Sequence, residues 1–341
     1  MRALIVDGKG GVKLLHDIPE PILGPYDALV KTAACGICNG TDLKIIAGAL
    51  KGYHNYPSIL GHEAAGEVIG VGEKVNAYHP GDKVIRCGLS GKLGEYESLF
   101  GGFAEYTLVT DIDAMKRDGL VGSHARAMQK VLPKQLNLNE ATMIITFQEV
   151  YSALIRLGIQ PGMNVAVAGC GPVGLSMIAI LRLMGVSSVT LIGHHDARMQ
   201  KGAELGADKL INSKYSDPVS ELNRYYPQGL DAFIDAVGHC SIINQAFQTI
   251  HDDGIIGVYG IGVHSDQKTD WDIMPYNCKL HFVQWPLEDG MFDAYPQLMD
   301  WIVNGKLNCS DFVTNVIPVE NFQEGFDCVK TRNGLKIALN F

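Results

Sequence analysis

The chain has 341 residues, more than usually fold around a single hydrophobic core, so two domains are expected. Hydrophobic residues make up 47% and charged residues 19% of it, a balance that excludes extended disorder. The net charge of −9 excludes nucleic acid and anionic membranes as main partners, because both attract basic surfaces.

The N-terminus and the cysteines indicate the compartment. Asp7 follows the start too closely for a signal peptide, and no apolar run approaches the length of a membrane span. Eight cysteines are too few for a disulfide scaffold, and only Cys35 and Cys38 are close together. We therefore expect a protein of the reducing cytoplasm.

The first third of the chain reads as a series of short strands separated by turns such as Pro80-Gly81. Because no helices lie between these strands, a small β-barrel or sandwich is expected. The predicted strands are residues 2–7, 27–32, 65–72, 82–86 and 103–109.

From about residue 140 the pattern changes. A helix is predicted at 140–157, and apolar strands then alternate with helices, which indicates a parallel sheet covered on both faces. The strands are expected at 164–168, 189–192, 231–236 and 255–260, and the helices at 173–184, 197–205 and 240–251. The last 40 residues are mixed, with a short strand at 335–339.

A glycine cluster joins the first of these strands to the first helix. Gly169, Gly171 and Gly174, with Pro172 and Val173 between them, fit the pattern G-x-G-x-x-G. There one glycine makes the turn, one lets a pyrophosphate approach, and one lets helix and strand pack closely. The cluster predicts a dinucleotide cradle; a purely structural tight turn is the alternative.

The next strand ends without the acid that would bind a free ribose 2′-hydroxyl. It ends in Gly193, followed by His194, His195 and Arg198. Glycine leaves room for a 2′-phosphate, and His and Arg can donate hydrogen bonds to it. NADP(H) is therefore predicted over NAD(H), unless Asp196 serves as a displaced acid.

With both halves considered, the chain resembles the medium-chain, zinc-dependent alcohol and polyol dehydrogenases over nearly its whole length. The resemblance rests on a series of motifs in the expected order. They are Gly36-Ile37-Cys38 with Thr41-Asp42, Gly61-His62-Glu63 with Gly66-Glu67-Val68, Pro80-Gly81-Asp82-Lys83-Val84, Gly102-Phe103-Ala104-Glu105-Tyr106, Gly169 to Gly174, and Glu204-Leu205-Gly206-Ala207-Asp208.

The resemblance implies an α/β protein of two domains. A β-rich, GroES-like catalytic domain would comprise residues 1–145 and 290–341, and a Rossmann-fold, doubly wound parallel-sheet domain residues 146–289. It also implies a homodimer or homotetramer.

The resemblance further implies a catalytic Zn²⁺ held by Cys38 and His62. A thiolate and an imidazole suit a tetrahedral site that keeps one position open for substrate. By the same resemblance Glu63 is an exchangeable or outer ligand and Asp42 braces the imidazole of His62. Cys35 is interpreted as a small buried hydrophobic residue.

Three departures from the family pattern concern loops. The stretch Cys38 to Asp42 has one extra residue, so the loop must bulge, and Gly40 makes this feasible. The four-cysteine lobe for a structural zinc is absent, since only Cys87 occurs between Val84 and Phe103, and one zinc per chain is expected. The stretch 111–128 is longer than usual and has no assigned function.

The fourth departure concerns the third protein ligand of the zinc. Counting back from Gln160 places that ligand at Ile145, which cannot bind metal. Glu149 lies about one helical turn later on a similar face, and we predict that it takes this role directly or through water. Gln148 and Glu63 are the alternatives.

The implied reaction is reversible oxidation of an alcohol, with zinc as Lewis acid and hydride transfer to the nicotinamide. Thr41 matches the hydroxyl that takes the substrate proton, and Lys44 stands where the relay often continues with histidine. The polar segment 51–57 suggests a polyol or sugar substrate, and Trp285 could line the pocket.

Two other functions compete with this one. The first is a zinc-free NADPH-dependent enone or quinone reductase of the same fold, which Ile145 favours and Cys38, His62 and Glu63 oppose. The second is a nucleotide-binding relative without catalytic activity.

Overall fold

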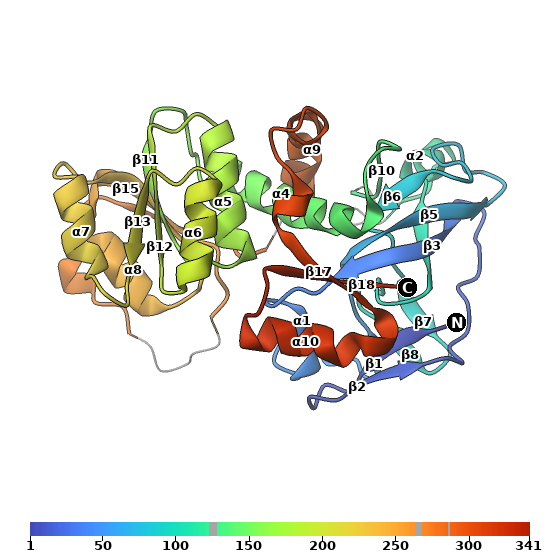
Figure 1. Cartoon of the computed structure of the whole chain (residues 1–341). Helices are drawn as coiled ribbons and strands as arrows, with labels where there is room; N and C mark the ends of the chain where they lie inside the picture. The colour runs from blue at the N-terminus through green and yellow to red at the C-terminus, as the bar shows by residue number, and fades with distance from the viewer. Residues whose placement is uncertain (123–127, 263–267, 286) are drawn as a thin grey trace. The chain divides into compact units, whose positions relative to one another are not determined.

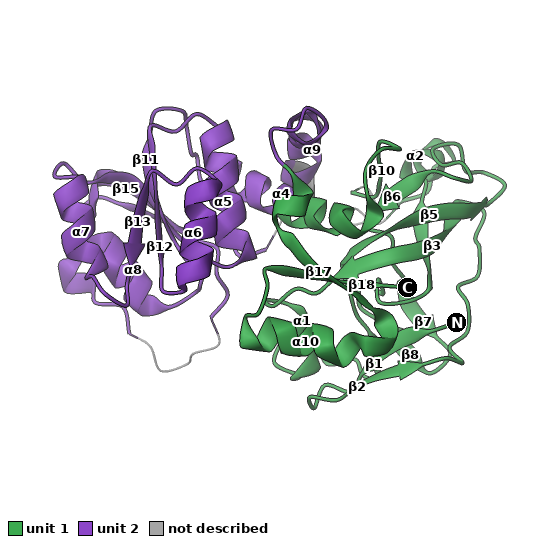
Figure 2. Ribbon diagram, in the orientation of Figure 1, with its two compact units in different colours: residues 1–146, 308–341 green, residues 147–307 purple. Residues whose placement is uncertain are grey.

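The computed structural model of the protein describes residues 1–122, 128–262, 268–285 and 287–341 (Figure 1). The chain forms two compact units (Figure 2): unit 1 comprises Met1–Thr146 and Asn308–Phe341, and unit 2 comprises Phe147–Leu307. Helix α4 (Leu138–Arg156) begins in the first unit and ends in the second. Within the described ranges, every helix is too short or too polar to span a bilayer.

Helix α9 (Glu288–Val303) places the second domain boundary later than predicted. The predicted boundary at residue 290 lies inside this helix, and the chain returns to unit 1 only after Leu307. The helix belongs to unit 2 because it packs on the second half of α4, where the Gln148 amide donates to the Met291 carbonyl over 2.7 Å.

Unit 1 contains two sheets of mostly short strands. One has the strand order β2-β1-β4-β8-β7; the other has the order β10-β6-β5-β3-β18-β17, with β9 also paired to β3. The strands are β1 (Ala3–Val6), β2 (Val12–Leu15), β3 (Asp27–Gly36), β4 (Ser58–Ile59), β5 (Glu63–Val71), β6 (Lys83–Ile85), β7 (Gly91–Leu93), β8 (Tyr96–Ser98), β9 (Tyr106–Thr110), β10 (Lys130–Val131), β17 (Val313–Pro318) and β18 (Lys336–Asn340).

Strand β3 organises unit 1 because it pairs with β5, β9 and β18. Its side chains alternate between buried and more exposed positions over most of its length, as expected for a sheet with one face on the core. The buried core combines side chains from distant parts of the sequence, among them Val30, Val68, Phe103 and Ile337. Among its described residues, the unit also contains the short helices α1 (Asp42–Ile46) and α2 (Ile112–Arg117), the first part of α4, and the longer α10 (Phe322–Thr331).

Unit 2 has one six-stranded sheet in the order β13-β12-β11-β14-β15-β16, with every pair parallel. Counted within the unit this order is 3-2-1-4-5-6, that of the Rossmann fold. The elements are β11 (Asn164–Ala168), β12 (Ser188–Gly193), β13 (Lys209–Asn212), β14 (Leu230–Asp235), β15 (Ile250–Val258), β16 (Lys279–Phe282), α5 (Pro172–Leu183), α6 (Asp196–Glu204), α7 (Pro218–Tyr225) and α8 (Cys240–Phe247).

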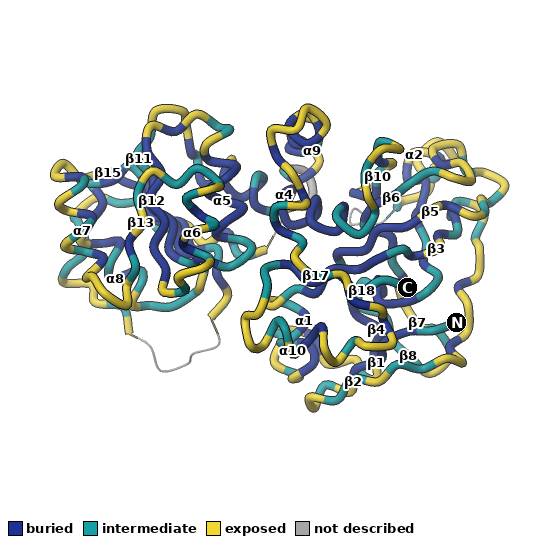
Figure 3. The backbone as a smooth tube through the Cα atoms, viewed as in Figure 1, coloured by how far each residue is buried: buried dark blue, intermediate teal, exposed yellow. Residues whose placement is uncertain are grey.

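The central strands of unit 2 are buried on both faces. All six residues of β12 and the last four of β11 are buried, which Figure 3 shows as dark strands in the interior of the unit. Three short 3₁₀ turns complete the secondary structure: Trp271–Ile273, Cys309–Asp311 and Val319–Asn321. The predicted fold class, a β-rich domain beside a doubly wound parallel sheet, is confirmed.

Candidate metal and cofactor sites

Cys38, His62 and Glu63 form a cluster of three potential metal ligands in unit 1. One ligand atom of each lies within 4.8 Å of the others, and no other such group of three is found in the described part of the chain. The pairing of β3 with β5 sets Gly36 opposite Glu63. The residues that follow β3 and precede β5 therefore meet at the same edge of the sheet.

The loop that carries Cys38 is closed by two hydrogen bonds. The Asp42 amide donates to the Cys38 carbonyl over 3.0 Å, and Asp42 Oδ2 accepts from the Cys38 amide over 2.8 Å. A Cβ added at Gly40 would approach only the Cys38 sulfur, at 3.9 Å. The extra residue in this loop is thus accommodated as a closed turn that fixes the thiol.

The imidazole of His62 is held between two carboxylates, with only 9% of its side chain exposed. Nδ1 lies 3.6 Å from Asp42 Oδ1, and Nε2 lies 3.9 Å from Glu63 Oε1. Burial acts to lower the pKa of His62, but the close approach and charge of Asp42 and Cys38 outweigh it and raise the pKa well above its usual range.

These atoms fit a bound zinc ion. His62 Nδ1 and Asp42 Oδ1 are both buried without a hydrogen-bond partner in the described structure, so a small tightening would join them. Such a hydrogen bond fixes a ligating imidazole with its other nitrogen toward the metal. Sulfur, nitrogen and carboxylate oxygen are the donors that zinc prefers.

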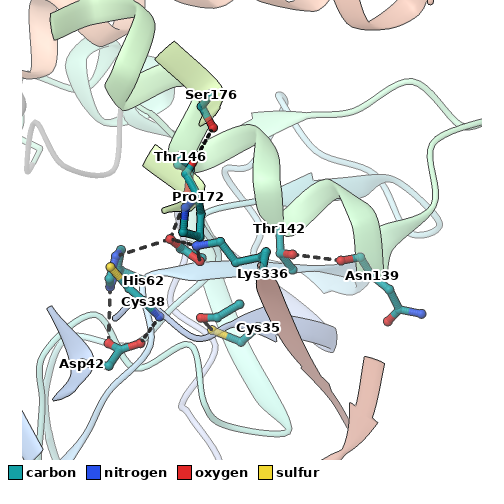
Figure 4. Close-up of polar contacts among 12 residues, drawn as sticks. Cys35, Cys38, Asp42, His62, Asn139, Thr142, Thr146, Pro172, Ser176 and Lys336 are labelled. Atoms are coloured by element: carbon teal, nitrogen blue, oxygen red, sulfur yellow. Dashed lines mark hydrogen bonds and ion pairs between the residues drawn. The ribbon is translucent and has the colours of Figure 1, made fainter. Parts of the chain in front are cut away.

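Glu63 is clamped by two residues that the sequence analysis did not identify (Figure 4). Lys336, from β18, donates to both carboxylate oxygens over 2.7 and 2.6 Å, and the Thr146 hydroxyl donates to Oε1 over 3.0 Å. Burial acts to raise the pKa of Glu63, but the charge of Lys336, with that of His62 and these hydrogen bonds, lowers it. Glu63 is therefore an ionised carboxylate, and residues of its own unit hold it in place.

The predicted proton-transfer residues, Thr41 and Lys44, follow Cys38 closely in the chain. Thr41 precedes α1 and is half-buried, and its hydroxyl makes no capping hydrogen bond. Lys44 is also half-buried. Burial lowers its pKa, and the charge of Cys38 opposes this only in part. The roles of Thr41 and Lys44 stay predictions.

Helix α4 contains Ile145, the position at which the family pattern predicts the third zinc ligand. Ile145 is completely buried, and Thr146 beside it contacts Glu63. Glu149 lies three residues beyond Thr146, in unit 2, and is not part of the described metal cluster. Its role as a ligand stays a prediction. Gln148 uses its amide to hold α9.

The segment 51–57 differs from the predicted polar substrate wall. Tyr53 is buried with its hydroxyl bonded to Ser58, and the Tyr56 hydroxyl donates to the Ile45 carbonyl over 2.8 Å. These two tyrosines pin the loop to its own unit, and the exposed polar residues of the segment are Lys51, His54 and Asn55. Trp285 is about half exposed and belongs to unit 2.

Phe100 is an aromatic residue beside His62 that the sequence analysis missed. The two rings lie 5.4 Å apart at an angle of 58°. Phe100 has a φ of 68°, the left-handed region, which costs a residue other than glycine roughly 1–3 kcal/mol.

The other unusual stretches of unit 1 have structural roles. Cys35 and Cys87 are buried, and all eight cysteines are free thiols. In the long stretch 111–128, residues 123–127 lie outside the described ranges. Asp111 anchors this stretch by accepting hydrogen bonds from the amides of Asn76, Ala77 and Ala114.

In unit 2 the glycine cluster has the geometry of a phosphate cradle. Gly169 has a φ of 119°, and a Cβ at Gly174 would lie 1.8 Å from the Gly169 carbonyl oxygen, so both positions require glycine. Gly171 precedes α5, and a Cβ there would meet nothing within 4 Å. Gly171 therefore leaves open space beside the start of α5, where the first N–H groups of a helix can bind a phosphate.

Gly193 has a different role from the one predicted. A Cβ there would lie 2.7 Å from the sulfur atoms of both Cys170 and Met199, so the glycine permits close packing and does not leave room for a phosphate. His195 Nδ1 is buried without a hydrogen-bond partner in the described structure. Asp196 accepts a hydrogen bond from Asn212 over 2.6 Å.

Comparison with known proteins identifies the family. The model of the alcohol dehydrogenase GroES-like domain matches residues 24–118, and that of the zinc-binding dehydrogenases matches residues 172–304. Sorbitol dehydrogenase of Bacillus subtilis (strain 168) is 26% identical over 96% of this chain and 93% of its own. Sorbitol dehydrogenase of Rattus norvegicus is 27% identical over 99% and 95%.

A solved structure agrees with these sequence matches. The alcohol dehydrogenase TADH from Thermus sp. ATN1 superimposes with a TM-score of 0.80 at 25% identity, covering 100% of this chain and 99% of that one. These matches favour the alcohol dehydrogenase interpretation over a zinc-free reductase or a non-catalytic relative. The chain belongs to the medium-chain dehydrogenase/reductase superfamily, among its zinc-dependent alcohol and polyol dehydrogenases.

Proposed function

We propose that the protein transfers hydride reversibly between a polyol, a sugar or another secondary alcohol and NADP(H), with one catalytic zinc ion per chain. The observation that carries the proposal is the cluster of Cys38, His62 and the buried Glu63, with an Asp42 oxygen beside the imidazole that has no hydrogen-bond partner among the described residues. The sorbitol dehydrogenases among its relatives support a polyol substrate.

Cys38 and His62 would hold the zinc, with Glu149 as the third protein ligand, directly or through water, and Glu63 as the exchangeable or outer one. Bound zinc supplies Lewis acidity toward the substrate hydroxyl. Asp42 keeps the proton on His62 Nδ1, so that Nε2 is free to ligate. Lys336 keeps Glu63 ionised and in place when it is not a ligand.

The substrate proton would leave through Thr41 and Lys44. The Thr41 hydroxyl is free of capping duty, so it can accept the proton of the alcohol and pass its own onward. Partial burial lowers the pKa of Lys44, which eases the release of a proton by this amine.

Unit 2 would bind the coenzyme at the carboxyl end of its sheet. The amides of Val173 and Gly174 at the start of α5 would bind the pyrophosphate. His195, whose buried Nδ1 is without a partner in the described structure, and Arg198 on α6 would bind the 2′-phosphate.

Steady-state reduction of NADP⁺ and NAD⁺ by polyols, sugars and simple secondary alcohols tests the proposal. We expect turnover with at least one alcohol, one zinc ion per chain, and loss of activity on chelation. Arg198→Ala should lower kcat/KM for NADP⁺ at least tenfold and leave NAD⁺ nearly unchanged, whereas the exposed Arg224→Ala in the same unit should change neither. Zinc-free protein with full turnover would refute it.

Two parts of the proposal have their own measurements. Glu149→Ala should lower zinc content or turnover, and wild-type values for both would remove Glu149 from the ligand set. Light scattering coupled to gel filtration should give the mass of a homodimer or homotetramer, and a 37.0 kDa species would contradict this.

A further inference from the structure

In the segment 88–103 of unit 1, backbone contacts fix the conformation of one aromatic residue, Phe100. The segment includes the hairpin of β7 and β8, which joins the sheet of β1 and β4, and then continues through Phe100 to Phe103. This is the part of the chain where a four-cysteine lobe is absent, and no second metal cluster replaces it in the described residues.

The backbone at Phe100 is fixed on both sides. Its carbonyl accepts the Leu89 amide over 2.9 Å, and it passes so close to Gly88 that a Cβ there would lie 2.0 Å from the carbonyl oxygen. Gly101 is left-handed as well, with a φ of 62°, and a Cβ there would lie 2.5 Å from Leu89. Phe100 therefore cannot relax to an ordinary conformation without displacing this turn.

The same turn is tied to the residue before His62. The Gly102 amide donates to the Gly61 carbonyl over 2.7 Å, and the Phe103 amide donates to the Leu60 carbonyl over 2.8 Å. Phe100 and His62 thus extend from two backbone segments joined by hydrogen bonds, and their rings meet at 5.4 Å.

A bulky residue in the left-handed region is a genuine outlier, since glycine, asparagine and aspartate are the residues that adopt it readily. Strained residues of this kind cluster at active sites, where the surrounding structure maintains them. Here the ring is only half-buried, so it does not serve the core alone. It lies against a metal-ligand imidazole of which 9% is exposed.

We propose that Phe100 is a specificity-determining residue: its ring forms the apolar wall beside His62 and limits the size of the group attached to the carbinol carbon. This inference rests on the proposed function. The ring contacts C–H surfaces of the substrate and leaves no room for a second bulky substituent. Secondary alcohols with a small group on that side, such as the C2 carbinol of a polyol with its terminal CH₂OH, are accepted, and alcohols with two bulky groups on the carbinol carbon are rejected.

Phe100→Gly and Phe100→Leu test the wall, with Arg332→Gly as the matched control. Arg332 ends α10 in the same unit with a φ of 60°, so its change to glycine also removes left-handed strain but does so at the surface. We expect Phe100→Gly to raise the ratio of kcat/KM for 2,4-dimethyl-3-pentanol, which has two bulky groups, over 3-methyl-2-butanol, which has one, at least tenfold, with unchanged zinc content. Phe100→Leu should shift it less, and Arg332→Gly should leave it unchanged.

A second measurement needs neither metal nor turnover. In metal-free protein, carbethoxylation of His62 by diethyl pyrocarbonate, followed by peptide mass spectrometry, should be at least several-fold faster in Phe100→Gly than in wild type or Arg332→Gly. An unchanged rate at His62 would overturn the wall. Equal loss of kcat/KM for both alcohols would overturn its role in specificity. A wild type that oxidises no alcohol refutes the proposed function, and the modification rate then decides about the wall alone.

Discussion

Lys336→Met isolates the buried ion pair that holds Glu63. The two side chains are 4% and 2% exposed, and Lys336 Nζ contacts both carboxylate oxygens. Removing one partner of a buried pair leaves the other charge in an apolar surrounding, which costs about 3–5 kcal/mol. We expect a loss of this size in the free energy of unfolding at pH 7, measured by urea denaturation with chelator present.

The double variant Lys336→Met/Glu63→Gln provides the internal comparison. It removes both charges and keeps the volumes similar, so it should be more stable than Lys336→Met and within about 2 kcal/mol of wild type. The exposed pair of Lys92 and Glu97, 3.3 Å apart in the same unit, serves as control, since Lys92→Met should cost under about 1 kcal/mol.

The contribution of Glu63 to the free energy of unfolding should change with pH in opposite directions in wild type and in Lys336→Met. In wild type, burial acts to raise the pKa of Glu63, but Lys336 and its other partners lower it. The resulting stability is present above the unfolded pKa, about 4.3, and is lost as the pH falls. Without Lys336, burial raises the pKa of Glu63, so the cost should be full at neutral pH and shrink on acidification. A loss below about 1 kcal/mol, or a double variant as unstable as Lys336→Met, would refute this account of the pair.

Three further outcomes are expected. Gly171→Ala should fold like wild type but bind coenzyme about tenfold more weakly, whereas Gly174→Ala, whose Cβ would collide with a carbonyl oxygen, should lose about 1–3 kcal/mol of stability; calorimetry and coenzyme titration measure both. For Asp111→Asn, urea unfolding at pH 7 should show a loss of about 1–3 kcal/mol that diminishes toward pH 3.5, because backbone hydrogen bonds outweigh burial and lower the pKa of this carboxyl. Zinc binding at pH 7 should release at least one proton, from His62, which titration calorimetry in buffers of different ionisation enthalpy measures. Wild-type coenzyme affinity in Gly171→Ala, a pH-independent loss for Asp111→Asn, or zinc uptake without proton release would contradict these expectations.

Local sequence patterns predicted the parts of the site that local structure determines. Cys38, His62 and Glu63 were predicted from the family motifs in which they stand, and the pairing of β3 with β5 brings them together. The glycine cluster was likewise predictable, because a strand, a turn and a helix in succession fix its conformation.

Contacts between distant segments could not be predicted in this way. Lys336 and Glu63 are separated by 273 residues, and the only signal was a lysine within the apolar strand 335–339. Phe100 gave no signal, since its left-handed backbone depends on hydrogen bonds to another turn.

Predictions that relied on side-chain type alone were the weakest. Gly193 suggested open space, yet two sulfur atoms fill it. The polar tyrosines of segment 51–57 suggested a substrate surface, yet their hydroxyls bond within the protein. A residue type limits what a position can do, and only packing decides which of those options is used.

The charges around the cluster explain why a divalent cation suits it. Without metal, the carboxylates of Asp42 and Glu63 are balanced by Lys336 and a protonated His62, whose pKa lies well above its usual range. With a neutral His62 and a Cys38 thiolate as ligands, two units of negative charge remain. Buried charge must be compensated, and Zn²⁺ supplies those two units while accepting sulfur and nitrogen donors. Lys336 therefore balances the charge of Glu63 both with and without bound metal. The site can keep this carboxylate although Ile145 stands at the position expected for the third ligand.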